Sequence, residues 1–307
     1  MLFLTIKMKV FRLTILSFLL IAAGYNVFLW TITFDKTNLE NLNEGEVQVI
    51  GHSGVGFFSF FPFKYFPSNS YGSISKALDE YKVEGVEVDL HLTADDKFVL
   101  FHDGNLDNKT TLTGCTGNKT LEELTQTKYQ LGAPFDWFQS ERIISLSELI
   151  DSLHKRKEFP FLHMDVRNWN ECNTPQENKV LEGKIALELI KLLNAKKVPA
   201  NKVLIISLSQ NLLTKLKELE NSYPVSFEIV GEGPQFLEWA IENGTESVTV
   251  KPRLLTIELS KKAHDAGMKV ITFGAKSKSG NKKLLELNPD VIQTDNIPAL
   301  KELMGYK

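Results

Sequence analysis

Short apolar runs alternate with helical segments along most of the sequence, and this alternation limits the fold more than any other feature. Several helical segments open with Ser, Thr, Asn or Pro, which favour the first turn of a helix. Strands separated by helices form parallel sheets, and eight such strands with one hairpin partner favour a (β/α)8 TIM barrel. The expected strands are residues 47–52, 85–92, 98–102, 159–166, 202–208, 226–230, 247–251, 269–273 and 291–294, and the expected helices are residues 72–82, 178–196, 209–221, 234–243, 255–266 and 281–287.

A doubly wound sheet is the alternative arrangement of the same elements. The sequence argues against it, because no Gly-rich dinucleotide-binding turn follows an early strand and no Gly-Lys phosphate loop occurs. The hairpin partner of strand 85–92 is expected to turn at Asp95-Asp96. We therefore expect residues 46–307 to form one α/β domain, a single TIM barrel.

The first 34 residues have the composition of a membrane-targeting segment. No Asp, Glu, Lys or Arg occurs from Leu13 to Phe34, and basic residues precede this run. About 20 apolar residues cross a bilayer as a helix, and a basic flank stays in the cytoplasm. We expect a signal anchor with the domain outside the cytoplasm, in the periplasm if the cell is Gram-negative. The alternative is a signal peptide cleaved near Ala22-Ala23-Gly24 and a secreted domain. Residues 35–45 are polar and predict a short tether.

Composition excludes several classes of protein. The 35 basic and 38 acidic residues nearly cancel, which argues against a nucleic-acid partner, and 43% apolar residues argue against a disordered chain. Two cysteines are too few for a disulfide-built miniprotein or a zinc site of four thiolates. An exported protein permits a disulfide between Cys115 and Cys172, but the sequence does not give the distance between them.

Ionisable residues gather at the ends of the expected strands, where a barrel places its catalytic groups. Glu87 and Asp89 share one face of their strand with His91, because side chains alternate along a strand. Asp165 lies on a later strand with the same pattern. Buried carboxylates are costly unless they are paired or bind a metal, and oxygen ligands suit Ca²⁺ or Mg²⁺. The sequence therefore predicts one divalent cation held by Glu87, Asp89 and Asp165.

His52 and His102 end two other expected strands, beside these carboxylates. A neutral imidazole can take a proton from an attacking hydroxyl and an imidazolium can protonate a leaving alkoxide, as cleavage of a phosphodiester requires. We expect these two histidines to be the acid–base pair and Arg167 to hold a phosphate oxygen. The sequence does not decide the role of His163. We expect structural roles for the remaining histidines, His91, His154 and His264.

Six short motifs mark these strand ends and the connections after them: GHSG at 51–54, PSNS at 67–70, GVEVDL at 85–90, HD at 102–103, DVR at 165–167 and TDNIP at 294–298. Together they resemble the motifs of the glycerophosphodiester phosphodiesterase family over roughly residues 47–303. The resemblance implies a (β/α)8 barrel that hydrolyses a glycerophosphodiester to an alcohol and glycerol phosphate. It implies the same histidine pair, the same three carboxylate ligands and a phosphate-binding role for Arg167.

The chain departs from the family pattern at several positions. Ser53 replaces a family arginine that contacts phosphate, and Lys251 is our candidate for the missing cation. Asp165 is one methylene shorter than the usual glutamate. Phe273 stands where the family often has tryptophan, and we expect it to contact the substrate together with Lys251.

An aromatic insert, residues 56–70, follows the first of these strands. It suits an acyl chain or a membrane surface if it is exposed, whereas the alternative is a loop packed on the barrel. The insert motivates a second functional hypothesis, a phospholipase-type enzyme that acts on intact lipid headgroups. A third hypothesis is an inactive metal- and ligand-binding barrel, because of Ser53. The sequence does not decide which histidine is the base, or whether water or a neighbouring substrate hydroxyl attacks.

Overall fold

The computed structural model describes residues 14–18, 20–21, 24, 27–29, 31–59, 63–219 and 222–306. The predicted targeting segment lies partly outside these residues, as do positions 60–62 of the aromatic insert. Within the part of the chain that is described, no helix has both the length and the apolar character needed to span a membrane.

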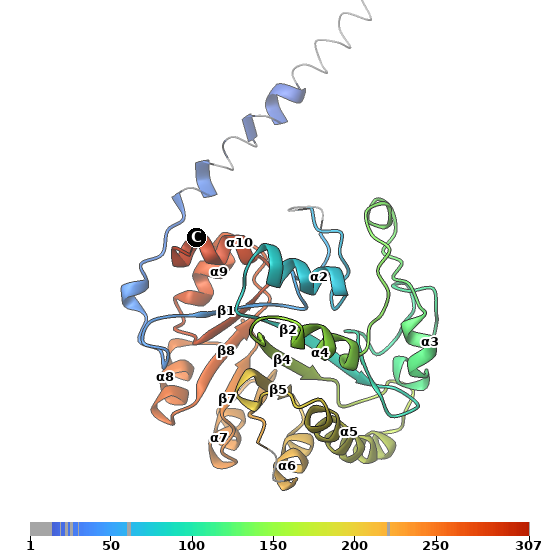
Figure 1. Cartoon of the computed structure of the whole chain (residues 1–307). Coiled ribbons are helices and arrows are strands. Elements are labelled where there is room, and N and C mark those ends of the chain that lie inside the picture. Colours follow the sequence, from blue (N-terminus) through green and yellow to red (C-terminus); the bar gives the residue numbers. More distant parts are fainter. Residues whose placement is uncertain are drawn as a thin grey trace, which may run out of the picture.

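Eight parallel strands close into a barrel, as predicted (Figure 1). The strand order is β1-β9-β8-β7-β6-β5-β4-β2, and β1 pairs with β2 to close the ring, with Ile50 opposite Gly85. β3 pairs with β2 in antiparallel orientation after a turn at Asp95-Asp96, which confirms the predicted hairpin. The strands are β1 (Gln48–Gly51), β2 (Gly85–Leu92), β3 (Phe98–Leu100), β4 (Phe161–Val166), β5 (Val203–Ser207), β6 (Val225–Ile229), β7 (Ser247–Val250), β8 (Lys269–Phe273) and β9 (Val291–Thr294).

Helices surround this barrel and cover its outer face (Figure 1). They are α2 (Tyr71–Ser75), continued by the π-helical η2 (Lys76–Glu80), α3 (Leu121–Thr125), α4 (Leu146–His154), α5 (Pro175–Ala195), α6 (Gln210–Glu218), α7 (Gln235–Glu242), α8 (Ile257–Asp265), α9 (Lys278–Leu285) and α10 (Ile297–Met304). The sequence analysis did not predict α3, α4 and α10. α3 is only five residues long, too short to show a period. α4 carries a capping box, Ser145 with Glu148, which is a recognisable start signal.

The alternation of side chains along β2 separates the core from the site. Val86, Val88 and Leu90 belong to the main hydrophobic core between strands and helices. Glu87 and Asp89 lie on the opposite face of the same strand, which lines the barrel interior. A second apolar cluster fills part of that interior: Ile50, Leu204, Ile206, Ile271 and Val291. The ionisable residues therefore sit beside a packed apolar floor rather than in an open pore.

The segment predicted as a tether lies against the barrel. Its short 3-10 helix η1 (Lys36–Asn38) is followed by Leu39, which is buried in the main core. The backbone N–H of Glu40 donates to Asn288 Oδ1 at 2.9 Å and that of Leu42 donates to Asp290 Oδ1 at 2.7 Å. These contacts fix the chain immediately before it enters β1.

Candidate active site

A cavity of about 150 Å³ opens at the carboxyl ends of the strands. In a barrel of this kind the carboxyl ends are the face where catalytic groups gather. All of the predicted site residues line this cavity except Asp89, which lies directly behind it. The lining residues are His52, Glu87, His102, Asp165, Arg167, Ile206, Glu228, Thr249, Lys251, Phe273 and Gln293.

Three carboxylates meet at one side of the cavity. Asp89 on β2 lies in register with Asp165 on β4, and Glu87 stands two residues earlier on β2. One oxygen from each of the three lies within 4.8 Å of the others. Burial and the neighbouring charge of Asp89 raise the pKa of Glu87. Burial alone would raise the pKa of Asp89, but the charge of Arg167 and the hydrogen bond from Asn69, together with the two nearby histidines, lower this pKa.

Two neutral side chains complete the hydrogen bonds of the carboxylates on β2. Ser53 donates from its backbone N–H to Glu87 Oε2 at 2.8 Å and from its hydroxyl to Asp89 Oδ2 at 3.0 Å. Asn69 donates from Nδ2 to the same Asp89 oxygen at 2.7 Å. Ser53 is fully buried. The serine that replaces the family arginine therefore supports the acidic cluster and offers no charge to a phosphate.

Arg167 at the end of β4 neutralises part of this acidic cluster. Its guanidinium contacts Asp89 and lies 3.1 Å from Asp165 Oδ2. Burial opposes the charge, but these two carboxylates raise the pKa of Arg167 above its usual range. The guanidinium carbon also lies 5.9 Å from the ring centroid of Trp169. The arginine thus lines the cavity and is at the same time an ion-pair partner of two predicted metal ligands.

Both histidines of the predicted acid–base pair hold a carboxylate through Nδ1. His52 Nδ1 lies 2.7 Å from Asp295 Oδ1, and His102 Nδ1 lies 2.6 Å from Asp103 Oδ1. A neutral imidazole whose Nδ1–H is donated to a carboxylate leaves Nε2 free to accept a proton. Burial lowers the pKa of His52, but the hydrogen bond and charge of Asp295, together with the charges of Glu87 and Asp89, raise this pKa to about 9. The sequence analysis missed Asp295 as a functional partner.

One phenylalanine links the two histidines. The ring of Phe57 meets that of His52 edge-on at 5.4 Å between centroids, and that of His102 edge-on at 5.2 Å. Phe273 packs on His52 as well, at 5.7 Å. These contacts place apolar surface directly beside both imidazoles.

The wall opposite the carboxylates carries groups from β6 and β7. Lys251, the predicted replacement cation, follows β7 and lines the cavity with Thr249. Glu228 on β6 is buried, and its Oε2 has no hydrogen-bond partner. Burial and the charge of Asp165 raise the pKa of Glu228. The sequence analysis missed Glu228, because a single glutamate in an apolar strand is no motif by itself.

The other histidines do not line the cavity. Burial lowers the pKa of His163 to about 3, and its Nδ1 lies 3.0 Å from Gln293 Nε2. His91 is buried too, and burial with the charge of Arg167 lowers its pKa to about 4. His154 contacts the backbone carbonyl oxygen of Lys196, and His264 pairs with Asp290. His163 thus contacts Gln293, which lines the cavity, and the structural roles expected for His91, His154 and His264 stay predictions.

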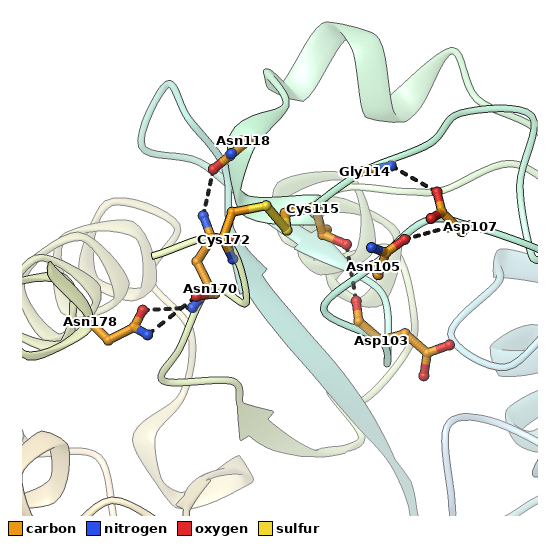
Figure 2. The surroundings of a disulfide bond; sticks show 10 residues. Asp103, Asn105, Asp107, Gly114, Cys115, Asn118, Asn170, Cys172 and Asn178 are labelled. Carbon is orange, nitrogen blue, oxygen red and sulfur yellow. Dashed lines mark hydrogen bonds between the residues drawn. A yellow bond between two sulfur atoms is a disulfide. The ribbon is translucent and has the colours of Figure 1, made fainter. Parts of the chain in front are cut away.

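A disulfide joins Cys115 and Cys172, the pairing that the sequence left open, with 6.1 Å between the Cα atoms. Figure 2 shows that it links the loop after β3 to the loop after β4. On the first loop, the Thr116 hydroxyl donates to the Asp103 carbonyl at 3.0 Å. Asn170 Nδ2 donates to Asn118 Oδ1 at 2.6 Å beside the bridge. The bridge therefore holds the His102–Asp103 segment against the loop that follows Arg167.

The aromatic insert is both packed and exposed. Phe58 and Phe63 pack on Phe135 from the loop before α4, with ring centroids 5.0 and 5.7 Å apart. Both rings nevertheless remain more than one third exposed, at 38% and 44%. One side of the insert thus packs on the protein and the other side is exposed, so each of the two predicted arrangements describes one side.

Comparison with known proteins agrees with the resemblance drawn from the motifs. A family model described as the glycerophosphoryl diester phosphodiesterase family matches residues 62–299. The matched region runs from the aromatic insert to α10, and it begins after His52. An uncharacterized protein of Mycoplasma genitalium is 28% identical over 183 residues, which are 58% of this chain and 66% of that protein. The chain thus spans just under two thirds of that relative's length.

Solved structures share the fold. The Oleispira antarctica phosphodiesterase, in complex with the product sn-glycerol-3-phosphate, superposes with a TM-score of 0.71 at 20% identity, over 84% of this chain and 96% of that chain. A Silicibacter pomeroyi protein named for glycerophosphoryl diester phosphodiesterase activity gives a TM-score of 0.71 at 19% identity, over 85% of this chain and 95% of its own. At these identities the likeness establishes the fold alone, a TIM barrel.

Proposed function

Since the chain belongs to the glycerophosphoryl diester phosphodiesterase family, we propose that it hydrolyses glycerophosphodiesters to an alcohol and glycerol phosphate by histidine acid–base catalysis. The family match confirms the predicted enzyme class, a phosphoric diester hydrolase. One observation carries the finer proposal: two carboxylate-bound histidines line the same cavity as Glu87 and Asp165, which belong to a cluster of three carboxylates.

His52 and His102 are the acid–base pair in this proposal. Each has its Nδ1 held by a carboxylate, so each offers Nε2 to the cavity. Hydrolysis of a phosphodiester needs one group to take a proton from the attacking oxygen and another to protonate the departing oxygen. Asp295 and Asp103 orient the two rings.

Glu87, Asp89 and Asp165 would hold one divalent cation, Ca²⁺ or Mg²⁺. Their oxygens lie close enough to share an ion, and hard cations prefer carboxylate oxygens. Two of these carboxylates already form ion pairs with Arg167, which supports the proposal that the cluster binds a positive ion. When bound, the cation neutralises the negative charge that builds up on the phosphate.

Arg167 and Lys251 would bind the phosphate of the substrate, and Phe273 would contact its organic part. Among the described residues that line the cavity, these two carry a permanent positive charge. They lie on opposite walls, at the ends of β4 and β7. A charge-assisted hydrogen bond from either one is worth about 1.5–3 kcal/mol, which can replace the contact that Ser53 does not make.

Location outside the cytoplasm belongs to the same proposal. The uncharged run from Leu13 to Phe34 supports a membrane anchor, or a secreted enzyme if this run is cleaved. The Cys115–Cys172 disulfide supports an oxidising compartment. A fractionation that found the full-length chain in the cytoplasm would contradict this part.

The activity is tested with the purified full-length protein. Chelator-treated enzyme is mixed with glycerophosphocholine, and release of glycerol phosphate is followed before and after addition of Ca²⁺ or Mg²⁺. We expect release only with the cation. If no glycerophosphodiester is cleaved with either cation, the proposed activity is wrong.

The cation site is tested by direct binding. Glu87→Ala combined with Asp89→Ala should abolish binding of Ca²⁺ or Mg²⁺ measured by calorimetry, while Glu158→Ala, an exposed carboxylate elsewhere, should not change it. Equal affinity in the double variant and the wild type would contradict the assignment of these ligands. Turnover that His52→Ala does not reduce would contradict the acid–base pair.

A second candidate is cleavage of intact phospholipid headgroups, supported by the phenylalanine rings beside both histidines. An acyl chain would find apolar surface there. Turnover on lipid vesicles compared with turnover on the deacylated headgroup distinguishes the two substrate classes. A rate that is higher on vesicles would favour the lipid substrate.

A further inference from the structure

Aromatic side chains from two separate connections meet near the mouth of the cavity. Phe58 and Phe63 come from the insert after β1, and Trp137 and Phe138 come from the loop between α3 and α4. We call these four residues the aromatic rim. Phe63 lies 5.4 Å from Phe138 between ring centroids, and the buried Phe135 packs beneath Phe58 and Phe63. Phe58, Phe63 and Phe138 therefore form one packed surface from two segments about 75 residues apart, and Trp137 adjoins it as the neighbour of Phe138 in the chain.

The rim is unusually exposed for large apolar side chains. Trp137 is 75% exposed, Phe138 54%, Phe63 44% and Phe58 38%. Isolated exposed apolar residues are common, but a contiguous patch of this kind marks an interaction surface. Trp and Phe are also the residues that settle most readily at the boundary between lipid headgroups and acyl chains.

The rim is continuous with the active site. Phe57, the residue before Phe58, touches the rings of both His52 and His102. Phe57 thus connects the two imidazoles to the exposed rings. A surface that covers the rim would lie next to the entrance of the cavity.

The N-terminal apolar run leaves the barrel close to the insert. Lys278 at the start of α9 donates from Nζ to the carbonyl oxygen of Leu29 at 3.0 Å. Lys64 of the insert donates from Nζ to the carbonyl oxygen of Asp295, and the next residue, Asn296, donates from Nδ2 to the carbonyl oxygen of Lys276 at 3.1 Å. In Figure 1 the described residues of the N-terminal segment, of the β1–α2 connection and of the loop before α4 lie on the upper side of the barrel.

We propose that the aromatic rim docks on the surface of a lipid bilayer and turns the mouth of the cavity toward it. The occupant is a bilayer because the sequence has a run of 22 residues, 13–34, without a charged side chain, and Leu29 within this run contacts the start of α9. An anchor alone attaches the barrel to the membrane at one point, near the start of α9. The rim supplies a second contact, which fixes the orientation of the barrel and keeps the site at the interface. The inference rests on the proposed membrane location but not on the proposed reaction.

The docking is tested on the full chain reconstituted into phosphatidylcholine vesicles whose acyl chains carry bromine near the headgroups. Bromine quenches tryptophan fluorescence at short range, so quenching reports which tryptophans enter the lipid. The chain has four tryptophans, and Trp30 in the apolar run contributes equally to every sample. We expect Trp137→Phe to remove part of the quenching seen in the wild type, and Trp239→Phe, on α7, to remove none. If Trp137→Phe and the wild type are quenched equally, the proposal is wrong.

A double substitution tests two other rim residues and leaves Trp137, the fluorescent reporter, unchanged. Phe63→Ser with Phe138→Ser should reduce the quenching of Trp137. The matched control is Val180→Ser with Leu187→Ser on α5, which removes two apolar side chains that are 68% and 54% exposed on another side of the barrel. Equal quenching in the rim and control variants would overturn the proposal. Circular dichroism shows whether each variant folds.

The same samples separate docking from catalysis. Soluble glycerophosphocholine reaches the cavity without a membrane, so the rim variant should hydrolyse it at the rate of the control variant. If no sample hydrolyses it, the proposed reaction fails while the quenching result still decides the docking. If only the rim variant loses this activity, the rim serves the site directly and the docking proposal fails.

Discussion

His52 and His102 each hold a carboxylate through Nδ1, but the two pairs are built in different ways. His52 follows β1, and its partner Asp295 follows β9, 243 residues later. The side chains of this pair are 14% and 3% exposed. His102 and Asp103 are sequence neighbours after β3, with side chains 40% and 30% exposed. The first pair is a product of barrel closure, and the second is a local feature of a loop.

This difference sets how strongly each carboxylate acts on its histidine. Charges in a buried pair interact with little screening, whereas water and salt weaken the interaction of a partly exposed pair. Asp103 is also shared with Lys109, whose Nζ lies 2.5 Å from Oδ2. The pair of His102 and Asp103, which we call the loop pair, is therefore held in position by neighbouring groups, and the Cys115–Cys172 bridge is one of them.

The largest effect is expected from removing either imidazole. His52→Ala and His102→Ala should each lower kcat/KM for a glycerophosphodiester by about 10²–10⁴-fold, because each removes one proton transfer. Release of glycerol phosphate measures it. His154→Ala, which removes a histidine that contacts only the Lys196 carbonyl and the Phe159 ring in the described structure, should leave the rate unchanged. A normal rate in His102→Ala would show that the loop pair takes no part in the reaction.

A smaller and unequal effect is expected from removing the carboxylates. Asp295→Asn should lower kcat/KM by about 10–100-fold, the range found when the carboxylate partner of a metal-binding histidine is removed, because the ring loses the group that orients it. Asp103→Asn should cost less, because the pair is more exposed and the charge is more screened. Equal losses of kcat/KM in the two variants would contradict the distinction between the buried pair, His52 with Asp295, and the loop pair.

The pH dependence of stability gives an independent reading of the buried pair. The pKa of His52 is raised to about 9, so the protonated form stabilises the folded state below the unfolded value of about 6.5. This contribution is lost as the pH rises from about 6.5 through 9. In chelator-treated protein, Asp295→Asn should flatten the decline in unfolding free energy over this window, as measured by denaturant titration. An unchanged decline would show that another group causes it.

Sequence patterns predicted the part of the site that lies on strands. Glu87, Asp89 and Asp165 follow from the two-residue period of β2 and β4, since alternation assigns each side chain to a face. The partners of these residues were harder to predict. Asp295 reaches His52 only because β1 pairs with β9, with Gly51 opposite Thr294, and no local pattern encodes that pairing.

Other residues were missed because their sequence context is ordinary. Glu228 is one glutamate in an apolar strand, and only the closed barrel brings it opposite Asp165. Ser53 was recognised as a departure from the family pattern, but the sequence does not show its left-handed backbone, with φ of 47°, in which the N–H and the hydroxyl both reach the carboxylates. The Cys115–Cys172 pairing required a distance between two loops, which composition does not supply.

Removing the disulfide should affect the loop pair more than the buried pair. The bridge closes a loop of 57 residues, for which chain entropy predicts about 4 kcal/mol of stabilisation. Cys115→Ser with Cys172→Ser should lower the unfolding free energy by up to this amount. NMR signals of the His102 ring should broaden or shift, while those of His52 should change little. Equal changes at both rings would contradict the view that barrel closure alone holds His52.

The smallest effect is expected from Ser53→Ala, which tests the support inside the barrel. The substitution removes the hydroxyl bond to Asp89 but keeps the backbone N–H bond to Glu87. A hydrogen bond to a charged group contributes about 1.5–3 kcal/mol, but Asn69 still donates to the same Asp89 oxygen and should limit the loss. We expect cation affinity, measured by calorimetry, to fall by about tenfold or less, which corresponds to about 1.4 kcal/mol.

Asn69→Ala, with Ser53 intact, should lower the cation affinity more than Ser53→Ala, because Asn69 Oδ1 also accepts the backbone N–H of Asp89 at 2.9 Å. If Ser53→Ala instead tightened cation binding, the serine would be a competitor for the Asp89 oxygen rather than its support.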